Sequence, residues 1–208
     1  MPIKQLRIPL LAIVAFVAIT VLSAQENGGG KLPIESDWAG ASPTLYNKGD
    51  QTFSISLGTM HPLFYLRANG TVTDLKSNLG GAGSLSYSYF LSPHFALGGE
   101  FGGMFSSTLG GNMLFILPFG LRATTQIILS PFEFPFSLMV GGASQGYLST
   151  NYFGFIVKPS AGAYWRYNPD WSFGFNATYW WVPQLTASSE TTIFGNFLEL
   201  TLTARYHF

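Results

Sequence analysis

The sequence has no cysteine and few charged residues. Without Cys, no disulfide can support the fold. Charged residues make up 10% of the chain, against roughly 25% in typical soluble domains. Aromatic residues and Gly are abundant instead, and only the N-terminus contains a long apolar run. This composition is unusual for a soluble domain and indicates that much of the surface does not face water.

The one long apolar run extends from Ile8 to Leu22, after a basic start and before Ser23-Ala24. These features are typical of a cleavable signal peptide, so we predict that residues 1–24 are removed on export. A retained membrane helix is the alternative, but 15 residues are fewer than the ~20 that span a bilayer. The mature chain then has 8 basic and 10 acidic residues, which gives no indication of nucleic-acid binding.

Residues 25–49 and 50–208 differ in pattern. The first segment is polar, Gly-rich and interrupted by two prolines, so we predict a lead-in with little fixed structure. From residue 50 onward the apolar residues recur with a period of two, which predicts β-strands. In the last strand one face consists of Leu198, Leu200, Leu202, Ala204, Tyr206 and Phe208, and the other contains Glu199, Thr201, Thr203, Arg205 and His207.

The two faces of these strands differ in size as well as in polarity. Bulky apolar side chains form one whole face of strand after strand, whereas Ser, Gly, Thr and charges form the other. A soluble β-sandwich also alternates, but it places its bulk inside. Small residues suit a cramped interior and bulky residues suit lipid. We therefore predict an all-β transmembrane barrel, closed because an open sheet would leave an unpaired edge in hydrocarbon.

Three Pro turns set the number of strands. Ser92-Pro93, Ser130-Pro131 and Asn168-Pro169 recur every 38 residues, and each dipeptide favours a tight turn. A unit of this length holds one strand, an outer loop and a returning strand, so four units give an eight-stranded antiparallel up-and-down barrel. The expected strands are 51–60, 82–91, 95–105, 112–128, 136–145, 153–167, 171–182 and 196–208.

Tryptophan and tyrosine gather at the expected strand ends. Such positions are typical of the aromatic girdles at the two membrane interfaces. The predicted girdle residues are Trp165, Tyr167 and Trp171 around one turn and Tyr179 and Trp181 at the opposite end.

The chain resembles the small bacterial outer-membrane β-barrels, a group that includes the OmpA membrane domain, OmpX and OmpW. The signal peptide, the turn spacing and the C-terminal strand ending Ala-Arg-Tyr-His-Phe carry the resemblance. It implies an outer-membrane location in a Gram-negative envelope, with residues 25–49 in the periplasm. It also implies a monomer surrounded by outer-membrane lipid, with Tyr206 and Phe208 in the signal that the barrel-assembly machinery recognises.

Six charged residues fall on inward-facing positions of the predicted barrel. An Arg or Lys on the lipid face would cost roughly 2–4 kcal/mol at mid-depth, which also favours the inward assignment. Either these charges pair across a filled lumen, with Glu100 and Arg122 as the first pair to examine, or they line a narrow polar path. The six are Glu100, Arg122, Lys158, Arg166, Glu199 and Arg205.

An enzymatic role is not expected. The lipid A deacylase family has a His-x-Ser arrangement and the palmitoyltransferase family has adjacent Asp-Ser, and neither occurs here. His61, His94 and His207 are scattered, so we predict no catalytic site, metal or cofactor.

Two non-enzymatic functions remain. The first is a narrow, porin-like channel for small or hydrophobic molecules. The second is a surface protein that binds an extracellular ligand or a host through the outer loops, expected at 61–81 and 183–195, because loops on a rigid scaffold often bind.

Overall fold

The computed structural model describes residues 46–74, 77–108, 110–147, 150–184 and 192–208. The predicted signal peptide, 1–24, and all of the lead-in before Tyr46 lie outside these residues. Within the described residues, no helix is long and apolar enough to cross a membrane.

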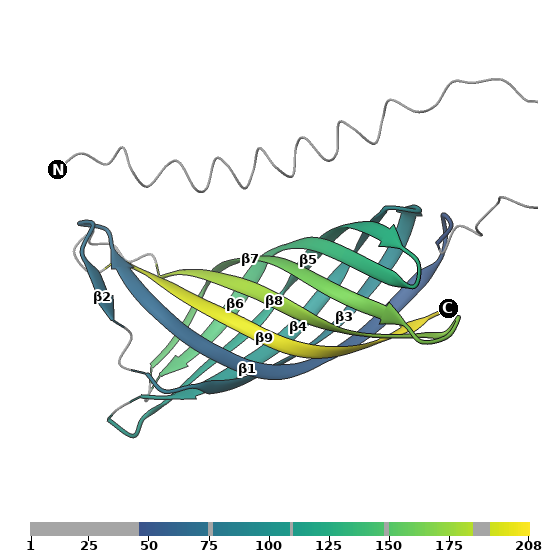
Figure 1. Cartoon of the computed structure of the whole chain (residues 1–208). Helices are drawn as coiled ribbons and strands as arrows, with labels where there is room; N and C mark the ends of the chain where they lie inside the picture. The colour runs from purple at the N-terminus through teal and green to yellow at the C-terminus, as the bar shows by residue number, and fades with distance from the viewer. Residues whose placement is uncertain (1–45, 75–76, 109, 148–149, 185–191) are drawn as a thin grey trace, which may run out of the picture. The chain divides into compact units, whose positions relative to one another are not determined.

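The described residues form a closed antiparallel barrel of eight strands, as predicted (Figure 1). Neighbouring strands in the barrel pair in sequence order, and β1 pairs with β9 to close it. A ninth, short strand, β2, pairs only with the end of β1. The strands are β1 (Gln51–Arg67), β2 (Val72–Asp74), β3 (Gly80–Ser92), β4 (Phe95–Ser107), β5 (Met113–Leu129), β6 (Phe132–Tyr147), β7 (Thr150–Arg166), β8 (Trp171–Gln184) and β9 (Ile193–His207).

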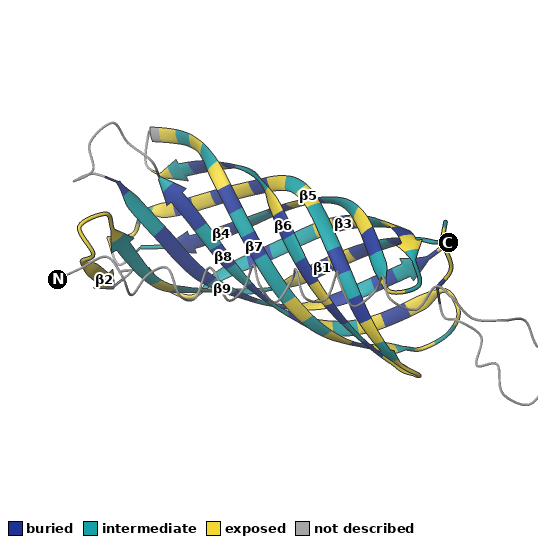
Figure 2. Cartoon of the chain, turned by 90° about the horizontal axis from the view of Figure 1, so that it is seen from above, coloured by how far each residue is buried: buried dark blue, intermediate teal, exposed yellow. Residues whose placement is uncertain are grey.

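Burial alternates along most of each barrel strand, except near the loop end of β1 and β9 (Figure 2). The exposed positions hold large apolar side chains, among them Leu121 at 79% exposed and Leu202 at 72%. The buried positions hold Ser, Thr, Asn and charged residues together with two apolar clusters, a larger one toward one end and a smaller one of Tyr46, Phe90 and Ala96 toward the other. The polar residues are therefore inside and the apolar ones outside, the reverse of a soluble protein and the arrangement that lipid requires.

The two ends of the barrel differ. The three predicted Pro turns join β3 to β4, β5 to β6 and β7 to β8 at one end, which we call the turn end. The C-terminus and the start of β1 lie there too. At the opposite end, the loop end, β1 continues seven residues beyond Met60, its last rung with β3, and pairs with β2 and β9. That is an extension of about 23 Å at 3.3 Å per residue.

The predicted outer loops, 61–81 and 183–195, are wrong in their extent. Strands β1, β2 and β3 occupy most of the first. In the second, β8 continues to Gln184 and β9 begins at Ile193, while 185–191 lie outside the described residues. Outside the lipid a strand needs no apolar face, so the period of two disappears. A register shift between Pro62 and Phe64 also reverses the alternation in β1.

Glycine pairs let some neighbouring strands approach more closely than a Cβ would permit. Gly120 on β5 lies opposite Gly141 on β6. A Cβ on Gly141 would lie 2.0 Å from the carbonyl oxygen of Phe119. By contrast, the nearest heavy atom to a Cβ on the outward-facing Gly99 would be 3.7 Å away.

We therefore expect Gly141→Ala to lower the free energy of unfolding by about 1–3 kcal/mol, because the backbone must shift to admit the methyl group. Gly99→Ala is the matched control and should leave stability unchanged or raise it by up to about 1 kcal/mol. Urea unfolding of the refolded variants in micelles, followed by tryptophan fluorescence, measures both. Equal stability of the two variants would contradict the close-approach argument.

Candidate functional site

The lumen is the candidate site, because it collects nearly all the polar chemistry of the described strands. Its side chains form layers from the turn end to the loop end. They are an ionic cluster at the turn end, a layer of hydroxyl and amide groups, a second ionic cluster at mid-depth and an apolar cap at the loop end.

The mid-depth cluster contains two carboxylates and two cations. Glu100 accepts hydrogen bonds from Arg122 at 2.9 Å and from Lys158 at 2.5 Å. Lys158 also lies 3.6 Å from Glu199, whose other neighbour is the indole N–H of Trp180 at 2.6 Å. The formal charges balance. A buried carboxylate without such partners would be far costlier than this mutually paired set.

The turn-end cluster is built around Glu133. Its carboxylate lies 3.3 Å from Arg205 and 3.5 Å from Arg166, and it accepts a hydrogen bond of 2.6 Å from Tyr46. The guanidinium of Arg205 also lies over the ring of Tyr164, 4.0 Å from its centroid. Glu133 is fully buried, and a buried carboxylate needs partners of this kind to offset its desolvation.

Between the two clusters, short polar side chains fill the lumen. Ser56 and Asn176 both bond Thr203, each at 2.7 Å, and Thr124 bonds Ser137 at 2.9 Å. A cavity lined by several of these side chains has a volume of about 10 Å³, which is at the lower limit for a single water molecule. The polar layer is therefore a packed interior.

Toward the loop end, the lumen contains a cluster of buried apolar residues, which we call the apolar cap. Buried Ser106, Gln145 and Asn196 lie at the same end. Three members of the cap are methionines, whose flexible side chains can fill irregular spaces and repack. Every member is at most 8% exposed. The cap consists of Met60, Ala82, Met104, Leu114, Ile116, Met139, Ala143, Ile156, Trp180, Val182 and Phe197.

Beside the apolar cap, the ladder between β7 and β8 stops. Its last rung toward the loop end is Val157–Trp181, although both strands continue. We call 154–156 and 182–184 the seam. The strands stay close, since a Cβ on Gly154 would lie 3.2 Å from the carbonyl oxygen of Pro183. Pro183 has no N–H to contribute to a ladder. Two residues of the seam, Ile156 and Val182, also belong to the apolar cap.

The seam begins where the predicted aromatic girdle lies. Trp171 and Trp181 are ten residues apart on β8, about 33 Å along the strand. At a tilt of ~40°, this distance matches the ~25 Å apolar band of an outer-membrane barrel. Within this span the ladder lacks two rungs around Pro159, between Val157–Trp181 and Ser160–Thr178. It ends at Val157–Trp181, near the outer border of the apolar band, where unpaired backbone is tolerated.

The six predicted lumen charges all lie on the inner face, and the structure joins Glu100 to both Arg122 and Lys158. The predicted girdle residues Trp165, Tyr167 and Trp171 are exposed on the outside, and Trp181 stacks on Phe194. His207 lies at the turn end, 2.8 Å from Ser172.

Sequence reasoning missed Glu133. The strand was expected to begin at 136, after Pro135, but β6 begins at Phe132 and includes the proline. The alternation itself contained the signal, because 133, 135, 137 and 139 share the buried face. Tyr46 was missed for a different reason, since it precedes the first strand and no period applies to it.

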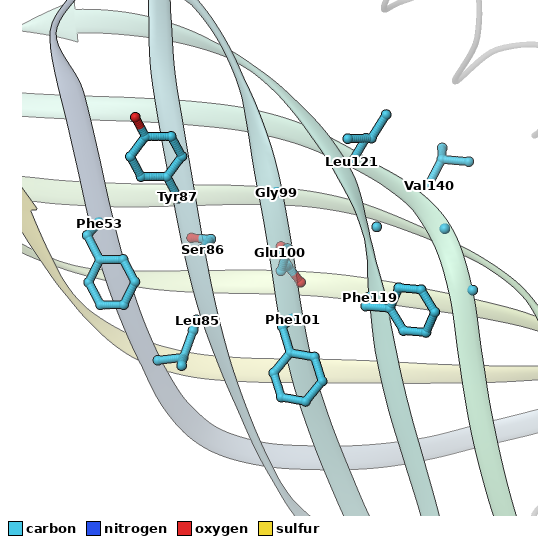
Figure 3. A pocket seen from close by; sticks show the side chains of 13 residues that line it. Phe53, Leu85, Ser86, Tyr87, Gly99, Glu100, Phe101, Phe119, Leu121 and Val140 are labelled. Atoms are coloured by element: carbon cyan, nitrogen blue, oxygen red, sulfur yellow. The ribbon is translucent and has the colours of Figure 1, made fainter.

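The outer face has a shallow depression across β3 to β6 (Figure 3). Gly99 forms its floor, and Tyr87, Phe101 and Leu121 stand around it, while Ser86 and Glu100 lie behind the strands. The depression faces outward among apolar side chains, so the hydrocarbon around the barrel fills it.

A protein-family model matches residues 34–206 of the chain. An uncharacterized protein of Treponema pallidum (strain Nichols) is 31% identical over 170 residues, which cover 77% of this chain and 78% of the relative. The chain belongs to the same family as this treponemal protein. A second uncharacterized protein of that strain is 31% identical over 68 residues, or 33% of this chain and 23% of the relative.

Solved β-barrel structures share the architecture of this chain. Neisserial surface protein A matches with a TM-score of 0.56 at 13% identity, over 77% of this chain and 97% of that chain. The outer membrane protein OprG from Pseudomonas aeruginosa matches with a TM-score of 0.55 at 11% identity, over 79% and 98%. The chain thus has the fold of outer-membrane β-barrels. The turn end corresponds to the periplasmic side of such barrels.

Removing one carboxylate from the mid-depth cluster should expose the dependence of the fold on charge pairing. We expect Glu100→Gln to lower the free energy of unfolding by about 3–5 kcal/mol, because Arg122 and Lys158 would lose a buried partner. The control is Asp170→Asn on an exposed turn, which should change stability by at most about 0.5 kcal/mol.

Urea unfolding of both variants in micelles provides the comparison. A loss for Glu100→Gln no larger than that for Asp170→Asn would show that the cluster is not needed to hold the barrel together.

Proposed function

We propose that the protein admits small apolar molecules from outside the cell into the outer membrane, by way of the apolar cap and the seam. In this proposal, the signal peptide 1–24 exports the chain and the barrel-assembly machinery inserts it as a monomer. It has no enzymatic activity and uses no cofactor. The resemblance of the sequence to the OmpA membrane domain, OmpX and OmpW is compatible with this role but is not evidence for it.

The filled lumen argues against passage along the barrel axis. A solute moving straight through would have to displace the apolar cap, separate the pairs of Glu100 and then pass the cluster around Glu133. Breaking a buried charge pair costs several kcal/mol. An axial route would therefore require the fold to give up the interactions that fill it.

The apolar cap and the adjoining seam support a lateral route. An apolar molecule would leave water for the cap, where methionine side chains can rearrange around it at little cost. From there, the seam, which includes Ile156 and Val182 of the cap, leads out of the barrel without a rung between 154–156 and 182–184 to break. The absence of rungs between 154–156 and 182–184 is the observation that carries the proposal.

A second candidate function is binding at the loop end. The extension of β1, paired with β2 and β9, presents an exposed turn at 68–71 on a hydrogen-bonded sheet. Such an element could bind an extracellular ligand or a host surface. If this is the role, transplanting 61–81 and 183–195 onto an inert barrel should transfer the binding.

Closing the seam with a disulfide tests the lateral route. Because the chain has no Cys, the double variant Ile156→Cys with Val182→Cys would form one disulfide. It would join the first pair of facing residues beyond Val157–Trp181. We expect the oxidised variant to slow the entry of N-phenylnaphthylamine, an apolar probe that fluoresces in lipid, into cells expressing it. Entry should then match that into cells without the protein, and reduction should restore it.

The matched control is Ser160→Cys with Thr178→Cys, which joins the same two strands at an existing rung. Its oxidation should leave probe entry unchanged. Entry that is the same in the oxidised and reduced seam variant would rule out the lateral route.

A further inference from the structure

Tyr46 comes before the first strand, yet its side chain lies inside the barrel at the turn end. It is 1% exposed. A short turn connects it to β1. The N–H of Asn47 donates to the carboxylate of Asp50, and the N–H of Gly49 donates to the carbonyl of Phe90 on β3. Gly49 has a φ of 104°, a conformation that glycine adopts without strain.

The residues around Tyr46 contact both its aromatic ring and its hydroxyl. Its ring stacks on Phe90 at 4.2 Å between centroids, and the guanidinium of Arg166 lies over it at 5.1 Å. Its hydroxyl donates to Glu133 at 2.6 Å. Burial raises the pKa of Tyr46 well above its ordinary value, so the hydroxyl keeps its proton and remains a donor.

Tyr46 and Phe90 stand between two spaces. On the outer side, Tyr46 lines a polar pocket of about 140 Å³ at the rim of the barrel, together with Arg166 and His207. On the inner side, Phe90 lines the small cavity of the lumen, together with Ser54 and Thr124. The stacked rings thus separate the periplasmic rim from the interior.

We propose that Tyr46 is a stopper, a side chain from the N-terminal segment that closes the periplasmic mouth by occupying a phenol-binding socket. The socket consists of Phe90, Glu133, Arg166 and His207. This role goes beyond the proposed lateral passage and does not depend on it. It explains why the barrel holds a side chain from outside its strands at the one end that has no apolar cap.

A cysteine placed inside the lumen reports whether the mouth is closed. Ser54 lines the small cavity and is 7% exposed, so Ser54→Cys should react slowly with a charged methanethiosulfonate reagent on refolded protein in micelles. We expect Tyr46→Ala to speed this reaction about tenfold or more, because a buried thiol otherwise reacts only when its surroundings open. Tyr46→Phe should leave it slow, since the ring remains stacked.

Two controls make the result specific. Ala143→Cys, in the apolar cap at the other end, should react equally slowly with and without the Tyr46 side chain. Adding p-cresol, which is the side chain of tyrosine as a free molecule, should slow the reaction of Ser54→Cys again in the Tyr46→Ala background. If Tyr46→Ala does not yield folded protein, Phe90→Ala removes the stacking partner and provides the same test.

Equal reaction of Ser54→Cys with and without Tyr46 would overturn the stopper. Faster reaction that p-cresol does not reverse would overturn the socket. Neither result bears on probe entry through the seam, so the two proposals fail separately.

Discussion

Every backbone amide of this protein that faces hydrocarbon needs a hydrogen-bond partner within the sheet. Lipid offers none, and each missing partner would cost several kcal/mol. This requirement explains why β9 closes onto β1 and why β7 and β8 pair from Arg166–Ser172 to Val157–Trp181, with a gap at Pro159, which has no N–H to donate. Beyond Val157–Trp181, near the outer border of the membrane, the ladder stops. In the proposed lateral route, the barrel therefore opens at the seam, where the backbone is close enough to water to do without a partner in the sheet.

Closure with eight strands has a second consequence, because the enclosed space is just wide enough for side chains to fill it. Lipid takes the apolar face of each strand, so the interior receives the polar one. Glu100, Glu133 and Glu199 are each held by cations or by N–H and O–H donors. Such pairs contribute little net stability over apolar packing, but losing one partner is costly. The ionic clusters therefore make the lumen a solid core more than a pathway.

The apolar cap is the exception to this inverted pattern. Its residues would suit the core of a soluble protein, and they lie at the loop end of the lumen. Binding in the cap would not stabilise a polar solute, whereas an apolar solute would be stabilised by leaving water. The cap and the seam therefore belong to one account of function, in which selectivity comes from the cap and release comes from the missing rungs. At the other end, the proposed stopper would close the lumen to the periplasm.

Much of the fold could be predicted from the sequence, because the membrane imposes a period of two on every strand that crosses it. The same alternation placed Glu100, Arg122 and Lys158 inside. The period lapses where lipid no longer faces the chain, so the extension of β1 and the strand β2 were missed. Glu133 was missed because the expected strand began at 136 whereas β6 begins at Phe132, and Tyr46 lies on no strand at all. The seam depends on which rungs form between two strands, and a single-strand pattern contains no such information.

The central claim is that the lumen is filled and conducts nothing along its axis. Current recordings on the refolded wild-type protein in planar lipid bilayers test it most directly. The account predicts a silent bilayer, with no discrete current steps at any applied voltage that the membrane survives. Steady, reproducible single-channel steps from the wild-type protein would contradict it.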